Sequence, residues 1–463
     1  MRQSAVSRTR TGAVYAAILL GGILAFLAIR RYGETLTPPA AAVGVPGGSG
    51  AVPQLSSDVF LHVLLALAAV VVVGRLLARA FRAIGQPPVI GEVIGGILLG
   101  PSLLGRVAPD AYGYILPPSI APYLSVLAQV GVVLYMFLVG LELNVEPLRR
   151  RAHAAIMTSH ASIVVPFVLG SLLALYLYPF LSPAGVPFTS FALFMGVAMS
   201  ITAFPVLARI LSDRGMTRSE LGVIALTCAA VDDVTAWCLL AFVVGVVQAR
   251  MEGAFLVAVL TLGFIAVMFL VVRPLAARAV DRLADRQTDR EAVALALVGL
   301  LLSALVSERI GVHAIFGAFL FGAVLPHDTA LARSLKERME DLVTVLLLPA
   351  FFAFTGMRTE IGLVSGFDEW LICGLIILVA TAGKFGGTLA AARFTGLPWR
   401  QATGLGILMN TRGLMELVVL NIGLDLGVIS PTLFTMMVLM ALVTTIATTP
   451  VLESLGLGRA CER

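Results

Sequence analysis

Long apolar runs dominate the chain and constrain its fold more than any other feature. There are fourteen of them, and most approach the roughly 20 residues that a helix needs to cross a bilayer. Within the hydrocarbon a backbone must satisfy its own polar groups, so such runs predict helices. The sequence therefore predicts an all-α polytopic membrane protein. The runs are 13–29, 59–80, 88–104, 122–143, 154–178, 189–211, 220–248, 254–272, 292–310, 312–325, 342–357, 370–392, 402–423 and 432–452, of which the tenth and eleventh are short.

The composition supports this prediction and excludes several classes of protein. Only 13% of the residues are charged and 59% are hydrophobic, whereas soluble domains carry about 25% charged residues. This excludes a soluble enzyme, a disordered chain and a secreted disulfide scaffold. The motifs HExxH and GxSxG and a phosphate-binding loop are absent, and the four cysteines show no CxxC spacing. We therefore expect no cofactor, no resident metal centre and no enzymatic activity.

The basic residues predict the orientation in the membrane. With the N-terminus placed in the cytoplasm, 24 of the 32 Lys and Arg residues fall on the cytoplasmic side and six on the other. The positive-inside rule therefore places both termini in the cytoplasm of a plasma (inner) membrane, with lipid around the helices. Because this asymmetry explains the basic balance, we expect no nucleic-acid partner.

The N-terminal run has two interpretations. Three arginines before residues 14–29 resemble the start of a signal peptide, whereas Arg30 and Arg31 directly after the run favour a retained helix. A Pro-, Gly- and Ala-rich linker follows at 38–53. We expect an N-terminal hydrophobic segment and linker at 1–57, one transmembrane domain at 58–455 and a short cytoplasmic tail at 456–463.

An internal repeat relates the two halves of the chain. Residues 91–100 align with 313–322 through Gly95/Gly317 and Gly100/Gly322. The segments 139–142 and 199–203 then fall opposite 355–358 and 409–413, in the same order. Runs 2–7 would pair with runs 9–14, and the single run between them would invert the second half. Inverted repeats are common in secondary transporters.

Five ionisable residues fall well inside the predicted spans. Each costs about 2.5–3.5 kcal/mol at mid-span on insertion scales, so they must be paired, hydrated or functional. Arg412 and Glu416 are spaced i, i+4, so we expect them to pair on one helix face. As supporting charges of the site they would have either a structural or a functional role. The remaining Asp232, Asp233 and Lys384 sum to −1, so one carboxylate needs a proton or a cation.

This unbalanced group predicts competition between cation and proton. Adjacent helical residues point about 100° apart, so one aspartate can face a partner helix while the other faces a cavity. Asp233 and Asp232 are the predicted cation- and proton-binding residues. A hard oxygen site of this kind suits Na⁺, K⁺ or Li⁺. The alternative is a buried polar cluster that locks helices together.

Helix-breaking sequences occur at repeat-matched positions in two runs. One run carries Thr202 and Pro205, and the other carries Asn410, Thr411 and Gly413. Proline removes a backbone donor and glycine weakens a helix, so each run is expected to unwind there. Paired interruptions are a sequence signature of a transporter site. Freed carbonyls, with the side chains of Thr202, Asn410 and Thr411, are expected to supply oxygen ligands.

Several motifs in combination resemble one known family. They are residues 85–92 (GQPPVIGE), 95–101 (GGILLGP), 137–142 (FLVGLE), the Asp232–Asp233 pair and 410–423 (NTRGLMELVVLNIG). These are similar to the second branch of the monovalent cation:proton antiporter superfamily, which contains the sodium/hydrogen exchanger domain. The last motif resembles plant cation/proton exchangers and their bacterial relatives.

The resemblance implies a fold and roles for individual residues. It implies thirteen helices, arranged as a dimerisation domain and a mobile core domain with crossed, broken helices, and hence a homodimer. Asp233 would bind the cation or proton, and Asp232 would be bridged to Lys384. Members with two adjacent acids are usually electrogenic. The chain departs from relatives by its additional N-terminal run and by having no nucleotide-binding domain after the spans.

The resulting hypothesis is a Na⁺ or K⁺/proton antiporter that works by alternating access. The main alternative is a cation channel-like or K⁺ efflux protein that is not coupled to protons. A transporter of organic anions on a similar fold is a weaker alternative, because two aspartates with one lysine suit a cation better.

Overall fold

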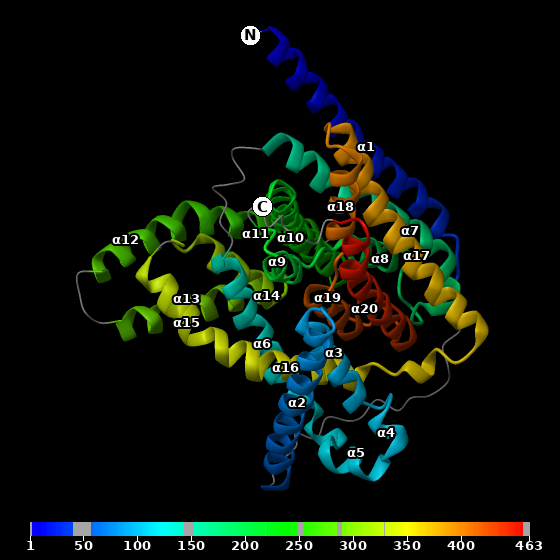
Figure 1. Ribbon diagram of the computed structural model, residues 1–463, viewed down its shortest axis with the longest axis vertical. Coiled ribbons are helices and arrows are strands. Elements are labelled where there is room, and N and C mark those ends of the chain that lie inside the picture. Colours follow the sequence, from blue (N-terminus) through cyan, green and yellow to red (C-terminus); the bar gives the residue numbers. More distant parts are fainter. Residues whose placement is uncertain are drawn as a thin grey trace.

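The computed structural model describes residues 2–39, 57–142, 152–217, 219–248, 254–284, 289–327 and 329–456 (Figure 1). Within these ranges every regular element is a helix. The helices are α1 (Arg2–Gly33), α2 (Ser57–Ala83), α3 (Pro88–Leu99), α4 (Leu104–Val107), α5 (Pro109–Ile115), η1 (Pro118–Ile120), α6 (Ala121–Glu142), α7 (Ala152–Leu181), α8 (Phe188–Ser200), α9 (Phe204–Asp213), α10 (Glu220–Gln248), α11 (Ala254–Val267), η3 (Met268–Val272), α12 (Arg273–Ala284), α13 (Asp289–Ile310), α14 (Ala314–Val324), α15 (Ala330–Leu342), η4 (Val343–Leu347), α16 (Leu348–Arg358), η5 (Ile361–Leu363), α17 (Phe367–Phe394), α18 (Trp399–Met409), α19 (Leu414–Asp425) and α20 (Pro431–Ser454).

The helical segments account for all fourteen predicted runs. In the described part of the chain, 12 candidate spans are long and apolar enough to cross a membrane. The bent pair of helices α18 and α19 would make a thirteenth. The short tenth run corresponds to the apolar helix α14. The eleventh differs from its expected bounds, because a candidate span covers 34 residues from Ala330 to Leu363. There the charged segment that precedes the apolar run is itself helical.

The helices pack in two groups (Figure 1). We call α7–α10 with α17–α20 the core group, because α17 packs on α7, α18 and α20, while α10 packs on α7, α8 and α18. The flanking group is α2, α3, α6, α13, α14 and α16, in which α14 packs on α6 and α16 packs on α3. The N-terminal helix α1 lies against α7 and α8 and therefore belongs with the core group.

The packing reproduces the predicted repeat. The pairs α2/α3, α6/α14 and α7/α8 have counterparts in α13/α14, α16/α3 and α17/α18, as expected if runs 2–7 correspond to runs 9–14. One span, formed by α11, η3 and α12, separates the halves, so the second half enters the membrane from the opposite side. The all-α inverted-repeat fold is therefore confirmed.

Glycines show the same symmetry at atomic detail. A Cβ atom on Gly100 would lie 2.4 Å from the carbonyl oxygen of Gly356, and one on Gly322 would lie 2.8 Å from the backbone nitrogen of Leu141, next to Gly140. Thus α3 meets α16 as α14 meets α6, each through a glycine pair. The absence of side chains permits this close approach of the helix backbones.

Some predicted features lie outside the described residues. They include most of the linker at 38–53, the arginines at 149–151, 218, 250 and 286, and the C-terminal tail beyond residue 456.

The glycine contacts generate a prediction about stability. Gly140→Ala would place a methyl group 2.2 Å from the Phe319 carbonyl oxygen, a backbone atom that cannot move aside. Overpacking of this kind costs about 1–3 kcal/mol, so the melting temperature of the purified protein in detergent should fall. The control is Gly374→Ala in α17, where an added Cβ meets no atom within 4 Å. An equal effect of the two substitutions would contradict the close approach of α6 and α14.

Candidate functional site

The two adjacent aspartates lie in the middle of a continuous helix, α10. The Ser219 hydroxyl accepts a hydrogen bond from the Gly222 amide at 3.0 Å and fixes the start of that helix. Both side chains are buried, with Asp232 0% and Asp233 2% exposed. Since consecutive helical residues diverge by about 100°, the two carboxylates meet different neighbours.

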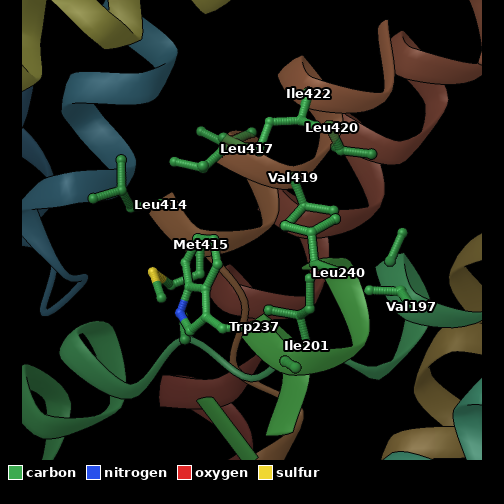
Figure 2. Close-up of a cluster of buried hydrophobic side chains, with 14 of the residues drawn as sticks. Val197, Ile201, Trp237, Leu240, Leu414, Met415, Leu417, Val419, Leu420 and Ile422 are labelled. Atoms are coloured by element: carbon green, nitrogen blue, oxygen red, sulfur yellow. The ribbon is translucent and has the colours of Figure 1, made fainter. Parts of the chain in front are cut away.

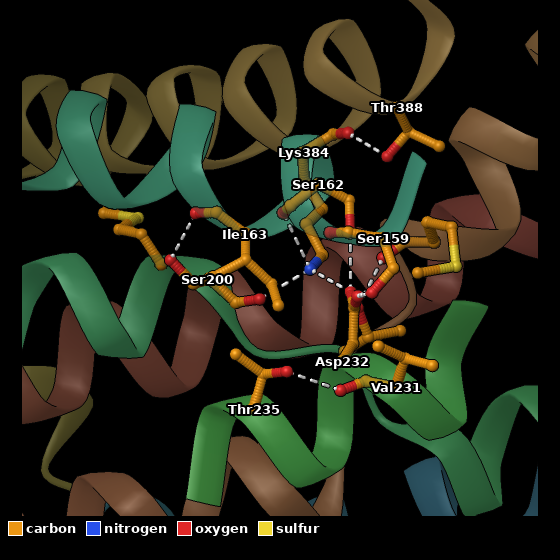
Figure 3. A network of polar contacts seen from close by, with 12 residues as sticks. Ser159, Ser162, Ile163, Ser200, Val231, Asp232, Thr235, Lys384 and Thr388 are labelled. Carbon is orange, nitrogen blue, oxygen red and sulfur yellow. Dashed lines mark hydrogen bonds and ion pairs between the residues drawn. The ribbon is translucent and has the colours of Figure 1, made fainter. Parts of the chain in front are cut away.

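Four donors surround the Asp232 carboxylate (Figure 3). Ser159 and Ser162 of α7 donate their hydroxyls to Oδ1 and Oδ2 at 2.5 and 2.7 Å. Thr202 donates to Oδ2 at 2.9 Å, and the Lys384 ammonium of α17 reaches the same oxygen at 2.9 Å. An ionised carboxylate accepts all of these bonds, so the arrangement suits the charged form of Asp232.

Lys384 is fully buried and donates to three oxygens. Besides the Asp232 Oδ2, its Nζ lies 3.0 Å from the carbonyl oxygen of Ser162 and 2.5 Å from that of Ser200. The three acceptors match the three N–H groups of an ammonium ion. The salt bridge between Lys384 and Asp232 is thus embedded in a complete hydrogen-bonding shell.

Asp233 has a contrasting environment. Neither of its carboxylate oxygens has a hydrogen-bond partner among the described residues. The Phe204 amide, at the N-terminus of α9, lies near the carboxylate but outside hydrogen-bond geometry. Buried polar groups without partners are rare in folded proteins, so this carboxylate is a candidate for binding a group from outside the described residues.

A narrow cavity adjoins Asp233. Several of the residues that line this cavity, among them Ile201, Trp237 and Met415, belong to the buried hydrophobic cluster in Figure 2. The Trp237 Nε1 is also buried and has no hydrogen-bond partner among the described residues, so a donor and an acceptor without partners belong to residues that line this otherwise apolar cavity. The lining residues are Ile201, Asp233, Ala236, Trp237, Leu240, Met415 and Val419.

Both predicted helix interruptions occur, and they cross each other. α8 ends at Ser200 and α9 begins at Phe204, while α18 ends at Met409 and α19 begins at Leu414 after a bend of 43°. The Ala203 amide donates to the Thr411 carbonyl at 3.0 Å, and the Thr202 hydroxyl lies 3.3 Å from the Met409 carbonyl. Backbone ends from both halves of the repeat therefore meet beside α10.

Arg412 and Glu416 form the predicted i, i+4 pair at 2.9 Å, fully buried. Arg412 lies in the second break rather than within a helix, and it also donates to the carbonyls of Ala198 at 2.8 Å and Met199 at 2.6 Å. Its charge thus satisfies the last carbonyls of α8, while Glu416 occupies the first turn of α19. A cation at the C-terminal end of α8 and a carboxylate at the start of α19 both interact favourably with the helix dipoles.

The predicted oxygen ligands Asn410 and Thr411 do not belong to the hydrogen-bonded cluster around Asp232. The Asn410 Oδ1 is buried without a partner in the described chain, and the Thr411 hydroxyl lies 3.4 Å from that of Thr448. Thr202, Asp232 and Lys384 form one hydrogen-bonded cluster. Sequence reasoning missed Ser159 and Ser162, although their i, i+3 spacing in an apolar run places both hydroxyls on one helix face.

Comparisons with known proteins agree with the fold. A family model described as "Sodium/hydrogen exchanger, transmembrane" matches residues 66–454. A Na⁺/H⁺ antiporter of Synechocystis, NhaS4, is 43% identical over 399 residues, which cover 86% of this chain and 97% of that protein.

Eukaryotic relatives are longer. The cation/H⁺ antiporter 20 of Arabidopsis thaliana is 41% identical over 406 residues, covering 84% of this chain and 48% of the plant protein. The K⁺/H⁺ antiporter 1 of Saccharomyces cerevisiae is 33% identical over 398 residues, covering 83% of this chain and 45% of the yeast protein. The chain therefore spans about half the length of these two relatives.

A solved structure has the same fold. The sodium proton antiporter MjNhaP1 of Methanocaldococcus jannaschii superimposes with a TM-score of 0.65 at 14% sequence identity, covering 86% of this chain and 98% of that one.

The buried ion pair generates a prediction about stability. Lys384→Met leaves the Asp232 carboxylate buried without its counter-ion, which costs about 3–5 kcal/mol, so the melting temperature in detergent should fall sharply. Adding Asp232→Asn removes the uncompensated charge and should recover most of the loss. The matched control is Lys336→Met, because Lys336 pairs with Glu142 at 2.6 Å with side chains 44% and 47% exposed. That exposed pair contributes about 0–1 kcal/mol. If the losses of stability from Lys384→Met and Asp232→Asn simply added in the double variant, the pairing of the two side chains would be contradicted.

Proposed function

Because the chain belongs to the sodium/hydrogen exchanger transmembrane family, we propose that it exchanges a monovalent cation, Na⁺ or K⁺, for protons across a membrane. The relatives' activities support this function, since the Synechocystis protein is a Na⁺/H⁺ antiporter and the yeast protein a K⁺/H⁺ antiporter. The chain is a multi-pass membrane protein of a transporter family and acts here as a secondary active antiporter rather than an enzyme.

The single observation that carries the proposal is the unpartnered Asp233 carboxylate. It lies on a cavity beside a carboxylate that already has four donors. A buried ionised carboxylate is costly unless it is paired, so Asp233 holds either a proton or a cation. One group that binds one or the other couples their movements, because binding of the cation requires release of the proton.

The crossing breaks supply the further ligands of the cation. Alkali cations bind several oxygen atoms, and free carbonyls at unwound helix segments are suited to this task. In our proposal the Thr202 hydroxyl, the Asn410 Oδ1 and backbone carbonyls of the breaks join Asp233 around the ion. The buried Asn410 Oδ1 without a partner supports this assignment. Arg412 and Glu416 support the site by holding the ends of α8 and α19 in place.

The two groups of helices provide a route for alternating access. The aspartates, Lys384 and both breaks lie in the core group. Movement of this group against the flanking group would expose Asp233 first to one side of the membrane and then to the other. The flanking group then serves as the stationary body and as the contact between two subunits of a homodimer.

The charges of the site make the exchange electrogenic in this proposal. Asp232, Asp233 and Lys384 sum to −1, so either a bound cation or a single proton brings the site to zero. A second proton, taken up by Asp232 when its pair with Lys384 opens, gives a proton-loaded site of +1. Each cycle then moves one net charge across the membrane.

We place the protein in the plasma (inner) membrane, surrounded by lipid, with both termini in the cytoplasm. The distribution of 24 basic residues on one side against six on the other supports this orientation. We retain the division into a hydrophobic segment and linker at 1–57, a transmembrane domain at 58–455 and a tail at 456–463.

Transport in proteoliposomes tests the function. With an imposed pH gradient, addition of Na⁺, K⁺ or Li⁺ should dissipate the gradient, and Asp233→Asn should reduce the rate to that of empty liposomes because the amide cannot bind the proton. The control, Asp368→Asn, changes an exposed aspartate at the start of α17 and should leave the rate unchanged. Failure of all three cations would overturn the proposal, and a cation current without proton movement would establish the channel-like alternative.

The charge balance generates a second prediction about transport. In the wild type, the rate should depend on a clamped membrane potential, since moving one charge through 100 mV is worth about 2.3 kcal/mol. The double variant Asp232→Asn with Lys384→Met keeps Asp233 but loses the second proton site. Its exchange should continue without dependence on the potential. A double variant that remains voltage-dependent would exclude the Asp232–Lys384 pair as the second proton carrier.

A further inference from the structure

Two of the three acceptors around Lys384 are backbone carbonyls, and within a regular helix each carbonyl already accepts an amide bond. The Ser200 carbonyl is free because α8 ends at that residue, and the last carbonyls of a helix have no partner within it. Ser162 differs, because it lies inside the continuous helix α7. Its carbonyl would normally accept the amide of the residue four positions later.

That later residue is Pro166, a buried proline inside α7. Proline has no backbone N–H, and its ring displaces the carbonyl four residues before it. The Ser162 carbonyl is therefore released where it can accept a hydrogen bond from the Lys384 ammonium, and its oxygen lies 3.0 Å from Nζ. Building on the proposed antiport function, we propose that Pro166 is a positioning residue, which keeps the Ser162 carbonyl available to the Lys384 ammonium during transport.

Helix packing supports this role independently. Gly383 directly precedes Lys384, and a Cβ atom there would lie 2.9 Å from the Pro166 Cα and 3.1 Å from its Cβ. One turn further along α17, a Cβ atom on Gly387 would lie 2.9 Å from the Val165 Cβ and 3.0 Å from the Ala161 carbonyl oxygen. The helices α17 and α7 therefore approach closely at the proline, and this approach places Lys384 beside the released carbonyl.

The released carbonyl gives Lys384 an anchor that does not depend on Asp232. Ser162 contacts both members of the ion pair, because its hydroxyl donates to Asp232 at 2.7 Å while its carbonyl accepts from Lys384. When Asp232 takes up a proton, the carbonyls of Ser162 and Ser200 still solvate the ammonium. Pro166 thus lets the pair open without leaving a buried charge unsatisfied.

A proline with only a structural role makes the same prediction for stability but predicts an unchanged pH profile of transport. Restoring an N–H in a helix interior repairs a missing hydrogen bond, so Pro166→Ala would leave stability unchanged or raise it. In our proposal the new amide also competes with Lys384 for the Ser162 carbonyl, and the ammonium loses its proton more readily. Stability and transport then respond in different ways to one substitution.

The other charged and titratable groups that face Lys384 are the same in the wild type and in Pro166→Ala. A change in the pH profile therefore reports on the carbonyl. These groups are Asp232, Asp233 and Cys228 on α10, Arg412 in the second break and Glu416 on α19.

The test compares wild type, Pro166→Ala and Pro179→Ala in proteoliposomes, with Na⁺ and K⁺ each supplied as the cation. Pro179 lies inside the same helix and makes the control substitution chemically identical. The initial exchange rate is measured across pH, and the melting temperature is measured in detergent. For Pro166→Ala we expect the alkaline limit of exchange to move to lower pH by about one unit, the scale of one hydrogen bond to a charged group. The melting temperature should not fall, and Pro179→Ala should keep the wild-type profile.

Each outcome decides between the two proposals. Wild type without exchange would overturn the antiport function itself. Active wild type with an unchanged profile in Pro166→Ala, or with the same shift in Pro179→Ala, would overturn the positioning role alone. If Pro166→Ala does not fold, Pro166→Ser is measured in the same way, since serine also restores the N–H. Failure of both variants to fold would assign Pro166 to structure and reject the proposal.

Discussion

One buried ammonium lies near two buried carboxylates, and the rest of the site depends on this surplus of one negative charge. Lys384 and Asp232 neutralise each other within a shell of hydroxyls and carbonyls. Asp233 stands one residue further along the same helix with no partner in the described chain. Burial makes the cost of an uncompensated charge high, so in our proposal the difference of one charge is met by an ion that enters from outside. Exchange follows from that requirement.

The broken helices make such a group possible inside a membrane. Backbone that leaves the helical path is tolerated at membrane depth only where it is buried in protein or lines a cavity. Here the two breaks satisfy each other through the bond from Ala203 to Thr411, and Arg412 closes the end of α8. The carbonyl of Ser200 then remains for Lys384. The repeat therefore has a structural consequence, since each half stabilises the helix interruption of the other.

Sequence reasoning reached the charged residues of the site but not its hydroxyls. Charges inside apolar runs are conspicuous because each is costly there, so Asp232, Asp233 and Lys384 could be singled out. Ser159 and Ser162 could not, because hydroxyls in membrane helices commonly bond to their own backbone, as Thr388 does with the Lys384 carbonyl. Pro166 carries the same ambiguity, since a proline within a span reads as a tolerated kink until a side chain is found at the carbonyl it releases.

The sequence by itself determined the membrane class, the apolar runs that form the helices, the pairing of the two halves and the surplus carboxylate. These follow from hydrophobicity, residue spacing and charge, which are local properties of the chain. The residue pattern alone did not decide which aspartate is paired, because neighbouring residues on a helix are equivalent until other helices pack around them. The tertiary structure pairs Asp232 with Lys384, as the family resemblance implied. Packing of α7 and α17 at Pro166 and Gly383 brings Lys384 to Asp232 and leaves Asp233 on the cavity. That choice depends on contacts between residues more than 200 positions apart, which the chain order alone does not specify.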